Sequence, residues 1–120
     1  MHELGIANSI LKAVRLEAAR YPGTRPRKVA VRIGELTAVD PCALEFCFTA
    51  IIRDTELESL ELVIETCARR HRCSACGAEF DVKNYEFQCP GCGALDALRI
   101  GGDELELAYL ELDEHETSIA

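Results

Sequence analysis

Two closely spaced cysteine pairs constrain this 120-residue chain more than any other feature of its sequence. Cys73 and Cys76 form the first pair, Cys89 and Cys92 form the second, and each pair is followed by Gly-Ala. A Cys-x-x-Cys turn lets two thiolates chelate one metal ion, and two such turns supply the four sulfurs of a tetrahedral site. The repeat therefore predicts two similar knuckles around one ion, with no open position for a substrate.

Seven cysteines in a sequence without a recognisable export signal favour metal binding over disulfides. Zn(II) is the expected ion, and its role is structural because four sulfur ligands close the coordination sphere. Iron in a rubredoxin-like site would use the same tetrahedron, so the spacing leaves these two metals open. A redox dithiol is less favoured, because that motif does not require a second matched pair.

The three remaining cysteines are predicted to be structural. Cys47 falls on the apolar face of a helical segment, Cys42 falls in the first turn of that segment, and Cys67 ends a strand segment. No catalytic partner for any of these thiols is evident in the sequence, so we assign them no chemical role.

Apolar periodicity predicts an α+β fold. Spacings of three and four residues indicate two helices, and strict alternation indicates three strands. The expected order is helix 4–20, strand 28–35, helix 41–53, strand 59–66, a metal-binding loop at 68–98 and strand 104–112. We therefore expect two helices on one face of a small mixed three-stranded sheet, with an inserted zinc-ribbon or rubredoxin-like module that holds the four cysteines.

The metal-binding loop is short of large aliphatic residues, so it cannot build a hydrophobic core of its own. A metal ion should substitute for that core. The sequence accordingly predicts two domains. Residues 1–67 plus 99–120 form an α/β domain, and residues 68–98 form an inserted zinc-binding domain.

Local signals predict where the two helices begin and end. Asp40 followed by Pro41 is typical of an N-cap and the first helical position. The first helix should end before Pro22, and its apolar stripe runs from Leu4 to Tyr21. We expect both ends of that stripe to face the core.

The charge of the chain argues against nucleic acid as a partner. The formal net charge is −8, and four thiolates around Zn(II) would add about −2. The only basic run is Arg69–Arg72, and such a short run is usually a solvated loop. No apolar run approaches the length of a membrane span, so we expect no membrane insertion and a cytoplasmic location.

The start of the chain forms a second candidate metal site. The amine of Met1, the imidazole of His2 and the nearby backbone amides are nitrogen donors, which suit Ni(II) or Cu(II) better than Mg or Ca ions. Glu3 supplies negative charge that offsets the unfavourable helix dipole at this end. A histidine at the second position is by itself a weak signal, because it is commonly a solvated terminal residue.

Together these features resemble the HypA/HybF family of hydrogenase nickel-insertion proteins. The resemblance covers essentially the whole chain, and its motifs occur in the expected order. They are Met1-His2-Glu3-Leu4, Val31-x-Ile33-Gly34-Glu35-Leu36, Asp40-Pro41-x-Ala43-Leu44-x-Phe46, the two Cys-x-x-Cys-Gly knuckles and Gly102-x-Glu104-Leu105-Glu106-Leu107.

The resemblance implies a nickel metallochaperone rather than an enzyme. The implied partners are a HypB-type GTPase and the large subunit of [NiFe]-hydrogenase, while delivery to urease stays open. The chain has no Gly-x-x-x-x-Gly-Lys-Ser/Thr loop, which is consistent with a separate GTPase. The implied ligands are Met1, His2 and Glu3 for Ni(II), and Cys73, Cys76, Cys89 and Cys92 for Zn(II).

Two other interpretations remain open at this point. A zinc-ribbon module that binds protein or nucleic acid would share the knuckles, and a rubredoxin-like electron carrier would hold iron in them. His71 lies two residues before Cys73 and is either a solvated loop histidine or a residue that tunes the metal site. His115 lies in an acidic tail and is expected to be solvated.

Overall fold

The structure, a computed structural model, describes residues 2–114. The chain forms two compact units, and both are discontinuous in sequence. The first holds the chain up to Val31, Val39–Glu65 and the chain from Glu106. The second holds Arg32–Ala38 and Thr66–Leu105, so the cysteine-bearing segment forms one unit with a short stretch from much earlier in the chain.

Two helices, α1 (Glu3–Ala18) and α2 (Pro41–Ile52), pack against each other in the first unit. Asp40 caps α2 as predicted, because its Oδ1 accepts hydrogen bonds from the amides of Cys42 at 2.9 Å and Ala43 at 3.3 Å. These amides would otherwise lack an intrahelical partner. Within the described residues, neither helix has the length and apolar character needed to cross a bilayer.

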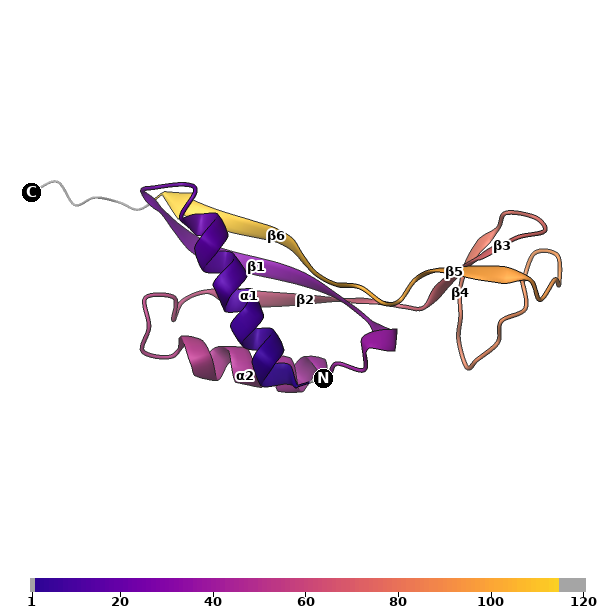
Figure 1. Cartoon of the computed structure of the whole chain (residues 1–120), viewed down its shortest axis with the longest axis horizontal. Coiled ribbons are helices and arrows are strands. Elements are labelled where there is room, and N and C mark those ends of the chain that lie inside the picture. The colour runs from indigo at the N-terminus through magenta and orange to yellow at the C-terminus, as the bar shows by residue number, and fades with distance from the viewer. Residues whose placement is uncertain (1, 115–120) are drawn as a thin grey trace, which may run out of the picture. The chain divides into compact units, whose positions relative to one another are not determined.

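Three strands form the larger sheet: β1 (Thr24–Gly34), β2 (Glu61–Cys67) and β6 (Leu105–Glu114). Their order is β2-β1-β6, with β1 in the centre. Figure 1 shows β1 and β2 running in the same direction and β6 running in the opposite one. The sheet is therefore mixed, and the predicted α+β fold with two helices and three strands is confirmed.

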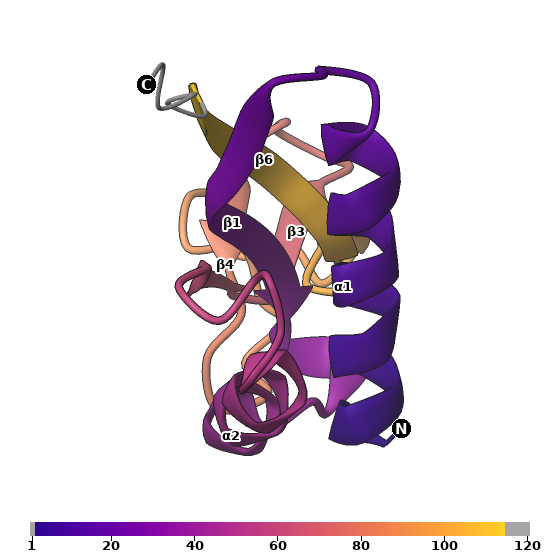
Figure 2. The ribbon, with the colours of Figure 1, turned by 90° about the vertical axis from the view of Figure 1, so that its left-hand side faces the viewer.

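The core of the first unit is aliphatic and lies between the helices and the sheet, with α1 beside β1 and β6 (Figure 2). Leu4 and Tyr21 were expected to face this core, but 51% of Leu4 and 48% of Tyr21 is exposed. Leu4 lies in the first turn of α1, and Tyr21 lies beyond the last helical residue, Ala18. The buried residues of α1 lie between them, in the middle of the helix. The buried apolar side chains of this unit include Ile6, Ile10, Leu11, Val14, Val29, Val31, Leu44, Phe48, Ile52, Leu57 and Leu60.

The second unit contains a smaller sheet that the sequence did not reveal. Its strands are β3 (Arg70–Cys73), β4 (Glu79–Asp81) and β5 (Ala97–Gly101), in the order β4-β3-β5 with both pairs antiparallel. Strands of three to five residues contain too few alternations for a periodicity to stand out. The predicted metal-binding loop is therefore partly a sheet.

A close backbone approach inside the second unit joins the end of β1 to the chain that leads into β6. The amide of Gly34 donates to the carbonyl of Glu104 at 2.7 Å, and the amide of Leu36, in the short helix η1 (Glu35–Thr37), donates to that of Gly102 at 2.8 Å. A Cβ atom on Gly34 would collide with the Gly102 carbonyl. Gly102 itself has φ +108°, a backbone conformation that favours glycine.

Two glycine substitutions should therefore have opposite effects on stability. Gly34→Ala should lower the free energy of unfolding by about 1–3 kcal/mol, because the two backbones must separate. Gly5→Ala is the matched control, since nothing lies within 4 Å of a Cβ placed there in α1. It should raise stability by about 0.5 kcal/mol through helix propensity. Urea unfolding of the metal-loaded protein measures both, and a neutral Gly34→Ala would contradict the close approach.

Candidate metal centre

The four paired cysteines meet at one point in the second unit. The Sγ atoms of Cys73, Cys76, Cys89 and Cys92 all lie within 4.8 Å of one another. The Cys73–Cys92 and Cys76–Cys89 sulfur distances are 3.5 Å and 3.6 Å. A tetrahedron with metal–sulfur bonds of about 2.3 Å has sulfur–sulfur edges of about 3.8 Å. The four sulfurs therefore fit one tetrahedral ion, and they would fill its coordination sphere.

The two Cys-x-x-Cys segments fold alike. The amide of Gly77 donates to the carbonyl of Cys73 and the amide of Gly93 donates to that of Cys89, both at 2.9 Å. The two glycines have φ of +78° and +77°, a conformation in which glycine avoids a steric penalty. The amide of Gly91 also points at the Cys89 sulfur, 3.4 Å away. The repeat in the sequence is thus a repeat in structure.

Hydrogen bonds from backbone amides and between the thiols give the four cysteines different pKa values. The amide of Cys92 is the largest influence on Cys89, whose pKa it helps to lower to about 7. The amide of Cys76 likewise leads the influences that lower the pKa of Cys73. The pKa of Cys92 is raised to about 12, because the neighbouring thiols and burial together outweigh the lowering effect of the Ala94 amide. Negative charge therefore forms first on Cys73 and Cys89, and like-charge repulsion holds protons on the other two sulfurs.

These two more acidic cysteines are also the buried ones. Cys73 and Cys89 form a small cluster with Phe80 and Val82, while Cys76 and Cys92 are exposed. This cluster, with the alanines packed against it, is the apolar core around the sulfurs. So small a core gives little burial energy, so we expect the fold around the sulfurs to depend on a bound metal.

His71 lies on β3 two residues before Cys73 and is only 5% exposed, so the alternative of a solvated loop histidine is wrong. Its ring lies 6.1 Å from that of Phe80 and 5.7 Å from that of Phe87. Arg69 donates from Nε to the Nε2 atom of His71 at 2.9 Å, and its guanidinium lies 4.8 Å from the centre of the Phe87 ring. Burial, followed by the positive charges of Arg69 and Arg99, lowers the pKa of His71 and keeps the ring neutral.

The basic run that contains Arg69 is not a solvated loop, which corrects the expectation from charge alone. Arg70 and Arg72 lie on β3, opposite acidic residues of β4. Arg70 forms an ion pair with Asp81 at 2.7 Å, and Arg72 lies 3.7 Å from Glu79. The positive charges are therefore compensated within the sheet.

Two acidic side chains that sequence reasoning did not single out bind backbone at the base of this unit. Glu35 accepts a hydrogen bond from the amide of Arg69 at 2.7 Å. Glu104 accepts one from the amide of Gly102, also at 2.7 Å. Their only sequence signal was their place in the Gly-Glu-Leu and Gly-x-Glu patterns, which do not reveal a partner.

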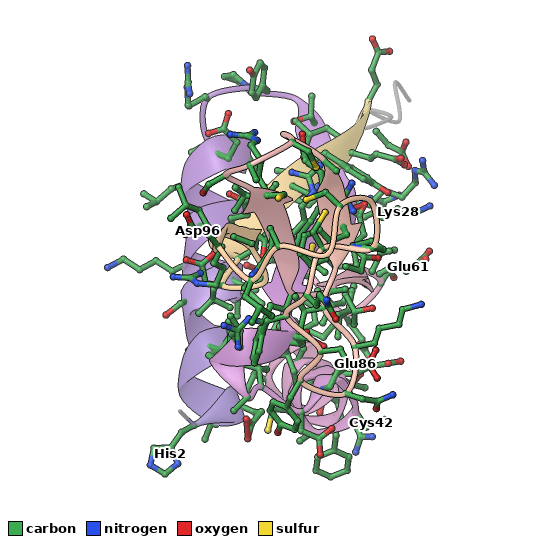
Figure 3. All side chains as sticks on the ribbon, turned by 90° about the vertical axis from the view of Figure 1, so that its right-hand side faces the viewer. His2, Lys28, Cys42, Glu61, Glu86 and Asp96 are labelled. Atoms are coloured by element: carbon green, nitrogen blue, oxygen red, sulfur yellow. The ribbon has the colours of Figure 1, made fainter. Side chains whose placement is uncertain are left out.

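The predicted nickel residues belong to the first unit. Met1 lies outside the described residues. His2 is the N-cap of α1, and its carbonyl accepts a hydrogen bond from the amide of Ile6 at 3.2 Å. Its side chain makes no capping hydrogen bond and extends away from the ribbon (Figure 3). Glu3 opens the helix and is partly exposed. The nickel site stays a prediction.

The fold and the cysteine cluster define a class: a small α+β protein with four clustered cysteines that can bind one metal ion. A family model described as "Hydrogenase/urease nickel incorporation, metallochaperone, hypA" matches residues 1–112. The hydrogenase maturation factor HypA of Geobacter metallireducens is 42% identical over 113 residues, which cover 94% of this chain and 100% of that protein. The chain belongs to the HypA family of nickel-incorporation metallochaperones for hydrogenase maturation.

Other relatives and solved structures agree with this assignment. The HypA of Chlorobium luteolum is 38% identical over 114 residues, which cover 95% of this chain and 97% of that protein. The solution structure of the Ni metallochaperone HypA from Helicobacter pylori matches with a TM-score of 0.63, 22% identity and coverage of 93% and 97%. A second HypA solution structure matches with a TM-score of 0.70, 22% identity and coverage of 97% and 98%. At this identity the two structures support the fold.

Metal uptake by the cysteine cluster should release protons. Cys76 and Cys92, whose pKa values are raised, stay protonated near pH 7 without metal, so a four-thiolate complex requires at least two protons to leave. The affinity of the cluster for the metal should fall as the pH drops below 7, because the Cys89 thiol, with a pKa of about 7, then also becomes protonated. Zinc titration of metal-free protein in weak buffer with a pH indicator measures the release. Cys42→Ser is the control, because Cys42 lies outside the cluster, and it should leave the number of protons released unchanged. Release of less than one proton per zinc ion would contradict this account.

Proposed function

We propose that this chain carries one Ni(II) ion at its amino terminus and delivers it to the large subunit of [NiFe]-hydrogenase. In this proposal the nickel ligands come from Met1, His2 and Glu3, and the ion is cargo rather than a resident cofactor. The observation that supports this most directly is the state of His2. Its imidazole is exposed at the start of a helix and is not used as a cap.

The local chemistry of the helix start suits a transferable cation site. The first amides of a helix have no intrahelical acceptor, so metal binding there breaks no helical hydrogen bond. The positive end of the helix dipole opposes a cation, and Glu3 in the first turn supplies compensating charge. A site at an exposed chain end can exchange its ligands one at a time with those of a partner, which a closed four-ligand cage cannot do easily.

We further propose that the cysteine cluster holds Zn(II) with a structural role. Four thiolates satisfy zinc completely, so the ion has no vacant position for chemistry. Its contribution is to hold together a unit with a very small hydrophobic core. Iron would fit the same sulfurs, and a colourless protein with stoichiometric zinc would exclude it.

The rest of the proposal concerns organisation and partners. Residues 1–67 plus 99–120 would handle nickel, and residues 68–98 would form the zinc-binding domain. The chain would act in the cytoplasm, without catalysis of its own, together with a HypB-type GTPase that supplies nucleotide hydrolysis.

The second candidate, a zinc-ribbon module for nucleic acid, is disfavoured by the ion pairs on β3. Arg70 and Arg72 pair with acidic neighbours, and Arg69 stacks on Phe87. Phosphate contacts would have to displace these partners in a chain of net charge −8. A protein-binding role for the module is compatible with metal delivery and needs no separate function.

Nickel titration of the protein with its native amino terminus tests the cargo site. We expect 1:1 binding that is lost in His2→Ala and in a version with one residue added before Met1, because each change removes a nitrogen donor from the site. Isothermal calorimetry with the cysteine cluster preloaded with zinc measures the binding. A loss of at least tenfold in affinity corresponds to about 1.4 kcal/mol.

A matched control separates the terminal site from other histidines. His115→Ala removes a histidine far along the sequence and should leave nickel affinity unchanged. Nickel binding that survives both changes at the amino terminus would remove the proposed site and leave the structural metal centre in place.

A further inference from the structure

A groove in the first unit runs between α1 and strand β6. It encloses about 580 Å³. Ala13, Glu17 and Tyr21 line it from the helix side. The strand side is lined by Leu107, Tyr109, Leu110 and Leu112. The groove uses none of the proposed nickel or zinc ligands, so a role for it is independent of the proposed function.

Apart from Glu17, the residues that line the groove are alanine, leucine and tyrosine, and several of them are open to solvent. Leu107 is 38% exposed, Tyr109 is 40% exposed and Tyr21 is 48% exposed. Exposed apolar side chains that gather at one hollow, rather than singly, mark a binding surface.

The strand that forms one wall is also the edge of its sheet. In the order β2-β1-β6, no further strand pairs with the outer side of β6 within the described part of the chain. Natural proteins commonly protect such an edge with proline or charged side chains. β6 contains no proline, and its charged side chains are all carboxylates, which disfavour an acidic strand but not a basic one. At ten residues, β6 is also longer than β2 at the opposite edge, which has seven. It therefore offers a long edge for pairing next to an apolar groove.

We propose that this edge and groove receive an extended segment of a partner protein, which adds to the sheet as a fourth strand beside β6. Alternate side chains of a strand point to opposite faces, so one set would enter the groove and the other set would lie on the far face of the sheet. The set in the groove must be apolar to match Leu107, Tyr109 and their neighbours.

The charge of β6 indicates which side chains the partner strand carries on the far face of the sheet. β6 carries four carboxylates, those of Glu106, Glu111, Asp113 and Glu114, and no lysine or arginine. Side chains directly opposite each other on neighbouring strands interact, and like charges there destabilise the pair. Arg27 of the neighbouring strand β1 forms ion pairs with Glu111 and Asp113, so basic side chains on a strand beside β6 are compatible with its carboxylates.

The partner strand therefore alternates apolar residues with lysine or arginine. The same cross-strand rule disfavours a second copy of this chain, since β6 paired with β6 would place acidic residues near acidic residues.

A synthetic peptide probes this proposal in the full-length, zinc-loaded protein. The probe is a capped peptide of about eight residues, the length of an ordinary strand, in which valine and lysine alternate. Two matched peptides serve as controls: one replaces lysine with glutamate, and the other replaces the two central valines with proline, which keeps the charge but cannot pair as a strand. Amide hydrogen exchange followed by NMR, at increasing peptide concentrations, gives the affinity of the peptide and identifies the amides that it protects.

Two protein variants separate the groove from general electrostatic attraction. Leu107→Lys places a charge in the apolar wall and should weaken binding of the valine–lysine peptide by about tenfold or more. Leu98→Lys makes the same change at a residue of the other unit that is 67% exposed, and it should leave binding unchanged. Both sites are exposed, so neither variant should prevent folding.

The expected result is slower exchange of alternate β6 amides with the valine–lysine peptide alone. Equal binding of the proline peptide would show simple charge attraction and overturn the proposal. Equal binding of the glutamate peptide would overturn the basic partner. Protection of β6 that rises with protein concentration, without peptide, would assign the edge to a second copy. Binding only after removal of residues 115–120 would assign it to the chain's own tail.

Discussion

The meeting of four cysteine sulfurs at one point is the constraint on which the second unit depends. Its buried cluster consists of Cys73 and Cys89 with Phe80 and Val82, so two of the four clustered residues are also candidate metal ligands. The strands around it are three to five residues long and could not form a stable sheet by themselves. We therefore expect metal binding and folding of this unit to be coupled, and the protonation state of the sulfurs to affect both.

Neighbouring groups prepare the sulfurs for this role before any ion arrives. The two knuckles repeat the same hydrogen bonds, and their amides lower the pKa of one buried thiol in each pair. On the strand that leads into the first knuckle, the ring of His71 accepts a hydrogen bond from Arg69 and packs against Phe87. Burial and the positive charges of Arg69 and Arg99 lower the pKa of His71, so the arrangement favours the neutral ring.

The first unit is held together by an aliphatic core rather than by clustered cysteines. This core packs two helices on a mixed sheet and uses none of the candidate metal ligands. His2 caps the start of α1 only through its backbone carbonyl, so its side chain takes no part in the cap. The sequence predicted α1, α2 and the strands of this sheet because each has several turns or alternations. It misplaced Leu4 and Tyr21, since a stripe cannot show where neighbouring elements stop covering it.

What the sequence determined by itself was local. The spacing within each cysteine pair sets a chelating turn, and Asp40 with Pro41 sets a helix start, because both effects act over a few residues. Only the tertiary structure decided that His71 is buried by Phe87, that Glu35 binds the amide of Arg69, and that α1 and β6 form a groove. Each of these contacts joins residues that are far apart in the sequence, and chain periodicity carries no information about such distant partners.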